Sequence, residues 1–307
     1  MKPSNIIDLN DRKAVEDFVN RFDYIICDCD GVLWIDKDVI PGAPQTLNKL
    51  RSLGKKIIFA TNNSTKTREE FLNKLKTFGF VANLKELFPS SYTTAIYLQM
   101  IKFSGKVYIL GSSGIAKELA KVHIESFGVG PDETPSNWSP GMADFDLDPN
   151  VKAVAVGFDN QLSFPKLAKA CSYVKNPKCL FIATNRDETY PSSKPEVVVP
   201  GPGALVSAIE TVTGRESISL GKPGTFFFDC IRYIHPEIDP KRTVMIGDRL
   251  TTDMVFGHNN GLKTFHVQTG IGTFEEMIDF ARSDKSEDQL CVPEYYAKSL
   301  AQILPFL

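Results

Sequence analysis

Short apolar runs alternate with amphipathic stretches along most of the chain. The runs have the length of buried strands, and the stretches between them repeat apolar residues with the period of a helix. Strands that alternate with helices are typical of a parallel sheet with helices on both faces. The predicted strands cover residues 24–27, 55–60, 107–111, 151–158, 179–184, 218–220, 243–248 and 263–269, and the predicted helices cover 11–22, 45–53, 66–78, 90–100, 114–121, 164–174, 225–235 and 274–282.

The alternation of strands and helices restarts after residue 103 and returns to its first form near residue 204. The residues between contain strands and a helix of their own, which favours an insertion over a second tandem domain. We therefore predict an α/β fold with a doubly wound parallel-sheet core, made from residues 1–103 and 204–307, and an inserted domain at 104–203. Tyr295 and Tyr296 are predicted to form an edge strand before a last helix.

Composition and charge narrow the class of protein. The 307 residues carry a formal net charge of -2, which gives no general attraction to nucleic acid or to anionic membranes. No run approaches the roughly 18 apolar residues of a membrane span, and the first ten residues lack the apolar centre of a secretory signal. The six cysteines are scattered without metal-ligand spacing, so we predict a cytoplasmic protein with reduced thiols.

Two carboxylates follow the first strand of the predicted core. The apolar residues 24–27 lead directly to Asp28 and Asp30, and Gly31 comes next. Side chains alternate along a strand, so both acids can emerge on the same side, at the carboxyl end where open α/β sheets place their chemistry. Because no Lys or Arg is near, the pair favours a site for a hard divalent cation. A solvated turn after a strand is the alternative.

Further polar residues follow other predicted strands, and in a parallel sheet such strand ends meet at one crevice. Carboxylates can hold Mg²⁺, while a hydroxyl group and an ammonium group can hold phosphate oxygens. A carboxylate can also attack phosphorus as a nucleophile. The combined set therefore indicates phosphoryl transfer. Its members are Asp28, Asp30, Thr61, Asn62, Asn63, Lys222, Asp248 and Asp253.

Four motifs resemble motifs I to IV of the haloacid dehalogenase-like hydrolases, and they occur in the same order. They are DCDGV from Asp28, TNNS from Thr61, GKP around Lys222 and GDRLTTD around Asp248. The resemblance covers nearly the whole chain, and it implies a Rossmann-like core with the insertion as a C2-type cap. Within the family, the chain is similar to the 4-nitrophenylphosphatase-like group, which includes phosphoglycolate phosphatase and pyridoxal phosphatase (chronophin).

The resemblance implies catalytic and metal-binding roles for the matching carboxylates. Asp28 would attack phosphorus and become an aspartyl phosphate, while Asp30 would protonate the leaving alcohol and then activate water. Mg²⁺ would be bound by the Asp28 carboxylate, the Asp30 main-chain carbonyl and Asp248. Asp253 would support the metal site through water or through Lys222.

The resemblance also implies which residues bind substrate. Thr61 and Lys222 would hold the phosphoryl oxygens as charge shifts towards the leaving group. Asn62 and Asn63 lie where the family contacts phosphate or the leaving group. The alternatives are helix caps for Thr61 and Asn63 and a surface position for Lys222.

Residues 184–191 follow a predicted strand of the cap and resemble the family's cap substrate loop. Asn185 and Arg186 are the predicted substrate-binding residues there, because an arginine can bind a substrate carboxylate bidentately. A solvated loop with an exposed arginine is the alternative. The loop is similar to that of phosphoglycolate phosphatases and lacks the histidine more often found in pyridoxal phosphatases. We therefore expect 2-phosphoglycolate as substrate, with activity on 4-nitrophenyl phosphate as well.

Several alternatives stay open at this point. Pyridoxal 5′-phosphate and phosphoproteins are other substrates within the same group. In a different class, a phosphotransferase would pass phosphate to an acceptor other than water, although Asp30 favours hydrolysis, and a non-catalytic binding protein would keep the fold without the reaction. The expected partner is a small phosphate ester, with no nucleic acid and no membrane. The resemblance also implies that a homodimer formed through the cap is possible, because C2-capped relatives often pair in this way.

Overall fold

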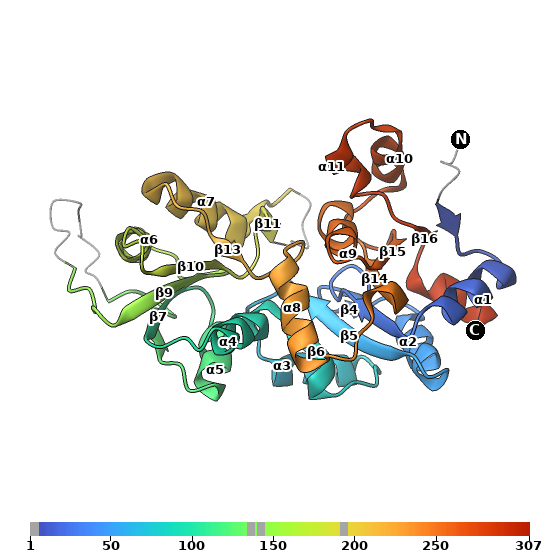
Figure 1. Ribbon diagram of the computed structural model, residues 1–307, viewed down its shortest axis with the longest axis horizontal. Coiled ribbons are helices and arrows are strands. Elements are labelled where there is room, and N and C mark those ends of the chain that lie inside the picture. Colours follow the sequence, from blue (N-terminus) through green and yellow to red (C-terminus); the bar gives the residue numbers. More distant parts are fainter. Residues whose placement is uncertain (1–5, 134–138, 140–144, 191–195) are drawn as a thin grey trace. The chain divides into compact units, whose positions relative to one another are not determined.

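The computed structural model describes residues 6–133, 139, 145–190 and 196–307. Packing divides the chain into two compact units, which are described separately (Figure 1). The core unit comprises Met1–Thr61, Arg68–Phe88 and Lys222–Leu307, and the cap unit comprises Asn62–Thr67 and Pro89–Gly221.

The core unit is built on a seven-stranded sheet with the order β1-β16-β15-β14-β2-β5-β6. The pairs from β1 to β5 along this order are all parallel. The strands are β1 (Ile7–Asp8), β2 (Tyr24–Cys27), β5 (Lys56–Thr61), β6 (Leu87–Pro89), β14 (Thr243–Gly247), β15 (Lys263–Val267) and β16 (Tyr295–Ala297), and a separate antiparallel hairpin joins β3 (Trp34–Ile35) to β4 (Asp38–Val39).

Helices surround this sheet. They are α1 (Arg12–Arg21), α2 (Ala43–Ser52), α3 (Arg68–Thr77), α8 (Thr225–Ile234), α9 (Val255–Asn259), α10 (Phe274–Arg282) and α11 (Ser286–Gln289). Short 3₁₀ turns cover η1 (Leu84–Glu86), η3 (Pro240–Arg242) and η5 (Leu300–Phe306), and a π-helical turn, η4 (Leu250–Met254), leads into α9.

Both faces of the central strands are buried, as the apolar run in β2 predicts. One face forms an apolar cluster with α1, α2 and α3, in which Ile25 and Ile246 of the sheet pack with Phe18 of α1. Ile26 and Met245 point the other way along the same strands and are also fully buried. A parallel sheet covered on both faces is the doubly wound arrangement that the sequence predicts.

One predicted detail of this sheet is wrong. Tyr295 and Tyr296 were expected in an edge strand, but β16 pairs with β15 on one side and with β1 on the other. The edge is β1, which has only two residues, Ile7 and Asp8. A two-residue strand carries no hydrophobic period, so the pattern of the sequence gives no sign of it.

The cap unit contains a second parallel sheet, with the order β13-β10-β9-β7-β8. Alternate residues of β7 reach opposite faces: Val107 and Ile109 pack with α4 and α5, whereas Tyr108 and Leu110 pack with α6 and α7. The elements are β7 (Lys106–Leu110), β8 (Ser126–Phe127), β9 (Val151–Val156), β10 (Leu180–Ala183), β13 (Ile218–Ser219), α4 (Ser90–Met100), α5 (Ser113–Lys121), α6 (Phe164–Val174) and α7 (Pro202–Thr213), with a small hairpin of β11 (Thr189–Tyr190) and β12 (Val199–Pro200).

The cap unit extends beyond residues 104–203, the range expected for the inserted domain. Helix α4 comes before this range and packs against α5, and β13 comes after it and pairs with β10. Packing partners therefore place both elements in the cap unit, whereas the strand and helix pattern had grouped them with the core. No helix within the described residues is long and apolar enough to cross a membrane.

One histidine of the core is fully buried. His266 lies in β15, where its ring stacks on Tyr296 with 6.5 Å between the ring centres. Burial lowers the pKa of the imidazole from 6.5 to about 4, and the negative charge of Asp253 opposes this only in part. The folded state therefore holds His266 neutral at pH values where the unfolded chain binds a proton.

This difference predicts that His266 weakens the fold in mild acid. Because the unfolded state binds the extra proton, stability should fall as the pH drops from 7 through the interval above pH 4, with His266 contributing a loss of about 2 kcal/mol by pH 5. Urea unfolding at pH 7 and pH 5 measures this. His266→Phe should flatten the pH dependence, and exposed His123→Asn should leave it as in the wild type. Equal slopes in all three proteins would contradict the assignment.

Candidate active site

A buried lysine joins two carboxylates at the carboxyl end of the core sheet. Lys222 Nζ donates to Asp28 Oδ1 at 2.6 Å and to Asp253 Oδ1 at 2.7 Å. Its third contact is the main-chain oxygen of Ala60, at 3.1 Å. Lys222 is only 2% exposed and Asp253 only 1%. The ammonium group therefore satisfies all three of its donors with protein oxygens, away from water.

The strand register explains why these groups meet. In β2, Cys27 pairs with Phe59 of β5 on one side and with Ile246 of β14 on the other. Asp28 follows Cys27 directly and Asp248 comes two residues after Ile246, so both lie just beyond the carboxyl ends of neighbouring strands. Thr61 is the last residue of β5 and is also buried.

Backbone N–H groups orient the carboxylates of Asp248 and Asp253. Ile271 N–H donates to Asp248 Oδ2 at 2.8 Å, and Arg249 N–H donates to Asp253 Oδ2 at 3.1 Å. These donors belong to loops that are themselves held by main-chain bonds, such as Gly272 N–H to the oxygen of Asp248 at 2.8 Å. The carboxylates are thus oriented before any ligand binds.

The charges of this cluster are not balanced by its own residues. Three buried carboxyl groups, those of Asp28, Asp248 and Asp253, share the single ammonium group of Lys222. Burial raises the pKa of Asp28 well above its usual range, although Lys222 pulls it down. Burial and the nearby Asp253 raise the pKa of Asp248 to about 7. Burial lowers the pKa of Lys222, but Asp253 and Asp28 outweigh this and raise it overall.

The same three carboxylates fit a hard divalent cation. Asp28, Asp248 and Asp253 each offer an oxygen, and these atoms all lie within 4.8 Å of one another. Carboxylate oxygens are the ligands that Mg²⁺ prefers, and a cation would offset the uncompensated negative charge. The predicted metal ligands were Asp28, Asp248 and the carbonyl of Asp30, with Asp253 in support. In the structure, Asp253 contacts Lys222 directly, and it is also one of the three carboxylates that could hold the cation.

Asp30 has a different hydrogen-bond partner from the carboxylates of the lysine cluster. It is half-buried, and its Oδ1 accepts a hydrogen bond of 2.8 Å from the indole Nε1 of Trp34. Trp34 was not among the predicted site residues. A buried indole N–H requires an acceptor, and the carboxylate four residues earlier in the same turn was the available signal.

Three further predicted residues lie in the cap unit: Asn62, Asn63 and Asn185. Their side chains form hydrogen bonds with other residues of the same unit. Asn185 is buried, its Nδ2 donates to the main-chain oxygen of Asn62 at 2.7 Å, and its Oδ1 accepts from Asp187 N–H at 3.0 Å. Asn62 Nδ2 lies 3.3 Å from both carboxylate oxygens of Asp187, and Asn63 Nδ2 lies 3.4 Å from the hydroxyl oxygen of Tyr190. Sequence reasoning missed Asp187.

Arg186, the other predicted substrate ligand, already has a carboxylate partner. Its guanidinium group donates to Glu210 through two bonds of 2.6 and 2.8 Å and to Ser217 Oγ at 2.9 Å. Arg186 and Ser217 lower the pKa of Glu210 to about 2. A substrate carboxylate would have to compete with Glu210 for this arginine. Pro191, the last residue of the predicted cap loop, lies outside the described residues.

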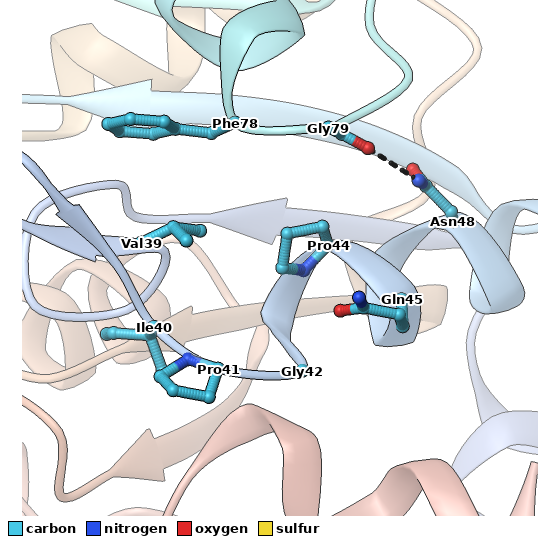
Figure 2. Close-up of a pocket in the computed structure, with 9 residues that line it drawn as sticks. All are labelled: Val39, Ile40, Pro41, Gly42, Pro44, Gln45, Asn48, Phe78 and Gly79. Atoms are coloured by element: carbon cyan, nitrogen blue, oxygen red, sulfur yellow. Dashed lines mark hydrogen bonds between the residues drawn. The ribbon is translucent and has the colours of Figure 1, made fainter.

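A surface pocket of about 270 Å³ lies elsewhere in the core unit (Figure 2). Its lining is mainly apolar. Two of the lining residues are joined by a hydrogen bond of 2.9 Å from Asn48 Nδ2 to the main-chain oxygen of Gly79. None of the predicted site residues lines it. The lining residues are Val39, Ile40, Pro41, Gly42, Pro44, Gln45, Asn48, Phe78 and Gly79.

Comparison with known proteins identifies the family to which this set of site residues belongs. Residues 25–125 match the haloacid dehalogenase-like hydrolase family, and residues 219–303 match a second family described as HAD-hydrolase-like. The chain is 40% identical over 298 residues to the glycerol-3-phosphate phosphatase of Rattus norvegicus, covering 93% of this chain and 91% of the relative. The chain belongs to the haloacid dehalogenase-like hydrolases, in their C2-capped branch.

Two further comparisons narrow the group within the family. The chain is 36% identical over 297 residues to the chronophin of Bos taurus, with 95% of each chain covered. Its fold is similar to a solved p-nitrophenyl phosphatase from Archaeoglobus fulgidus, with a TM-score of 0.78, 28% identity, and coverage of 93% of this chain and 99% of the other. The relatives named as phosphatases support a phosphoric monoester hydrolase.

Gly31 tests how tightly Asp248 is held. It has φ +80, and an added Cβ would lie 2.4 Å from Asp248 Oδ2. Gly54 has a similar φ of +86 with nothing within 4 Å, so Gly54→Ala carries the same backbone strain, about 1–2 kcal/mol, without the clash. Gly31→Ala should weaken the binding of Mg²⁺, measured by isothermal titration calorimetry, and Gly54→Ala should not. Equal responses would show that Asp248 has room to move.

The lysine cluster predicts a non-additive effect on stability. Lys222→Met would leave two buried carboxylates without their ammonium partner, so it should lower the free energy of unfolding by about 3–5 kcal/mol. Asp253→Asn removes one of these charges, so the double variant should lose clearly less than the sum of the single losses. Urea unfolding of the four proteins without added metal measures this coupling. Additive losses would mean that the contacts contribute independently.

Proposed function

We propose that the protein is a Mg²⁺-dependent phosphatase that hydrolyses small phosphate monoesters through an aspartyl phosphate on Asp28. The observation that supports this most is the buried contact of Asp28 and Lys222 beside Asp248 and Asp253. A carboxylate that is stripped of water and held by a fixed ammonium group is suited to attack phosphorus. The same ammonium group can bind phosphoryl oxygens once the ester is present.

Each residue contributes a separate step to the reaction. Asp28 attacks phosphorus while the bond to the alcohol breaks, and Asp30 gives a proton to the leaving oxygen. Asp30 then takes a proton from water, which attacks the aspartyl phosphate and regenerates Asp28. Thr61 and Lys222 donate hydrogen bonds to the phosphoryl oxygens. Mg²⁺, held by the carboxylates of Asp28 and Asp248 and the main-chain oxygen of Asp30, would offset the negative charge of the phosphoryl group.

For the substrate, we propose 2-phosphoglycolate, because the cap loop resembles that of phosphoglycolate phosphatases, and glycerol 3-phosphate is the second candidate. Both are small acyclic esters, and the relatives named glycerol-3-phosphate phosphatase match the chain at 40–41% identity. The ion pair between Arg186 and Glu210 favours the second candidate, because it leaves the guanidinium group engaged by a protein carboxylate. Pyridoxal 5′-phosphate is the alternative to be excluded.

Asp28→Asn tests the nucleophile. The amide keeps the shape of the side chain but cannot form the phosphoenzyme, so kcat for 4-nitrophenyl phosphate should fall by at least about 10³-fold. Circular dichroism and the unfolding midpoint should show that the variant still folds. Retained turnover in a folded variant would refute Asp28 as the nucleophile.

A substrate panel separates the remaining possibilities. The values of kcat/KM are measured for 2-phosphoglycolate, glycerol 3-phosphate, pyridoxal 5′-phosphate and a phosphopeptide, with Mg²⁺ and with EDTA. We expect the two acyclic esters to lead and EDTA to abolish activity. Inorganic phosphate in equal amount to the released alcohol supports a hydrolase, whereas a phosphorylated acceptor would identify a phosphotransferase. Activity that survives EDTA would contradict the metal requirement.

A further inference from the structure

The hydrogen bond from Trp34 to Asp30 carries an inference beyond the residues already assigned. Trp34 Nε1 donates to Asp30 Oδ1 at 2.8 Å, and among the described residues no other donor contacts this carboxylate. An indole N–H donates and cannot accept. The bond therefore occupies one particular oxygen of Asp30 and leaves the second oxygen, Oδ2, without a protein donor in the described part of the chain.

The indole itself is held firmly. Trp34 is fully buried, its ring packs against Phe78 and Phe80, and Lys74 Nζ lies 4.1 Å above the ring. Such a cation over an indole face adds an attraction of its own. The ring is thus fixed by contacts that do not involve Asp30.

The backbone near Trp34 is closed by separate bonds. Gly31 N–H donates to the main-chain oxygen of Trp34 at 2.8 Å, and Leu33 N–H donates to that of Cys29 at 2.8 Å. Strand β3 continues this turn, with Trp34 paired to Val39 of β4. Because none of these bonds uses the indole, the turn should survive replacement of the ring.

We propose that Trp34 is a positioning residue that makes Asp30 Oδ2 the proton-carrying oxygen of the general acid. Since the indole N–H needs a lone pair, it favours the unprotonated oxygen, so the acidic proton of neutral Asp30 lies on Oδ2. The inference rests on the proposed phosphatase reaction. It assigns to Trp34 a task that packing alone would not require.

The proton balance of the first step follows from this arrangement. Asp28 forms a bond to phosphorus, the phosphorus–oxygen bond to the alcohol breaks, and its electron pair goes to the leaving oxygen. That oxygen takes the proton from Asp30 Oδ2, so the alcohol leaves neutral and Asp30 becomes a carboxylate. The Trp34 N–H bond is then charge-assisted and stronger, which favours this step. In the second step, the Asp30 carboxylate takes a proton from the attacking water.

Leaving-group dependence distinguishes this task from packing. An alkyl ester needs the proton from Asp30, whereas 4-nitrophenolate leaves readily without it. In Trp34→Phe, kcat/KM for the better alkyl ester of the panel should fall about 10- to 100-fold, and kcat/KM for 4-nitrophenyl phosphate should fall less than about 3-fold. This ratio reports the first step alone, so slower hydrolysis of the phosphoenzyme does not affect it. Equal losses for the two esters would overturn the proposal.

Two controls make the result specific. Phe80→Leu removes a ring partner of Trp34 and keeps the N–H, so it should leave the ratio of the two kcat/KM values unchanged; a shift as large as in Trp34→Phe would assign the effect to packing. Asp30→Asn should shift the ratio in the same direction, and Trp34→Phe should add little to it in the double variant. A full further shift would mean that Trp34 does not act through Asp30.

If Trp34→Phe does not fold, 3-benzothienylalanine at position 34 replaces the N–H with sulfur in a ring of nearly the same shape. It should produce the same shift, and an unchanged ratio would overturn the proposal. Asp28→Asn is assayed in parallel. Retained turnover in that variant refutes the proposed function itself, whereas lost turnover together with an unchanged ratio in the Trp34 variants refutes only the role of Trp34.

Discussion

The ammonium group of Lys222 lies buried between the carboxylates of Asp28 and Asp253, and the rest of the core site depends on this contact. Removing such charges from water costs several kcal/mol for each ion, and only close opposite charges with complete hydrogen bonding offset that cost. The two carboxylates lie 194 and 31 residues from Lys222 along the chain. The end of β2 and the turn η4 must therefore reach the same place as the lysine loop, or the cost is not recovered.

The contact also explains why a bound cation would stabilise the site: Lys222 leaves part of the buried negative charge uncompensated. Lys222 offsets one of three buried negative charges, and the N–H groups of Arg249 and Ile271 supply partial positive charge to Asp253 and Asp248. The raised pKa values of Asp28 and Asp248 reflect the charge that remains. A divalent cation removes this excess at the point where phosphoryl oxygens would add more. The acids are already oriented, so little reorganisation is needed when the ester arrives.

The elements that the sequence predicts well are those whose signal is local. The run at 24–27 is buried on both faces, and α6 and α10 begin and end where their amphipathic pattern predicts. The order of the motifs predicts that the ends of the strands that precede them lie together. The structure confirms this for Asp28, Lys222, Asp248 and Asp253, which form one buried cluster. This part of the site follows from parallel topology, because strand ends in one sheet share an edge.

The parts that escaped prediction depend on partners chosen only in the folded chain. Strand β1 has two residues and no period, so nothing short of its pairing with β16 identifies it. Arg186 stands at the position expected for a substrate ligand, but its guanidinium group already donates two hydrogen bonds to Glu210 of α7. Trp34 is the intermediate case, since its burial follows from the pattern, and its need for an acceptor could have been combined with the nearby Asp30.

The division into units suggests how one reaction can serve different esters. The peptide bonds between Thr61 and Asn62 and between Gly221 and Lys222 are points where the chain passes from one unit to the other. Thr61 and Lys222 are thus covalent neighbours of residues held by the cap unit, where Asn185 ties Asn62 to the backbone of Asp187. Substitutions at Asp187 therefore act on the hydrogen bonds of Asn62, the residue covalently linked to Thr61. A fold of this kind can carry different specificities when such residues change.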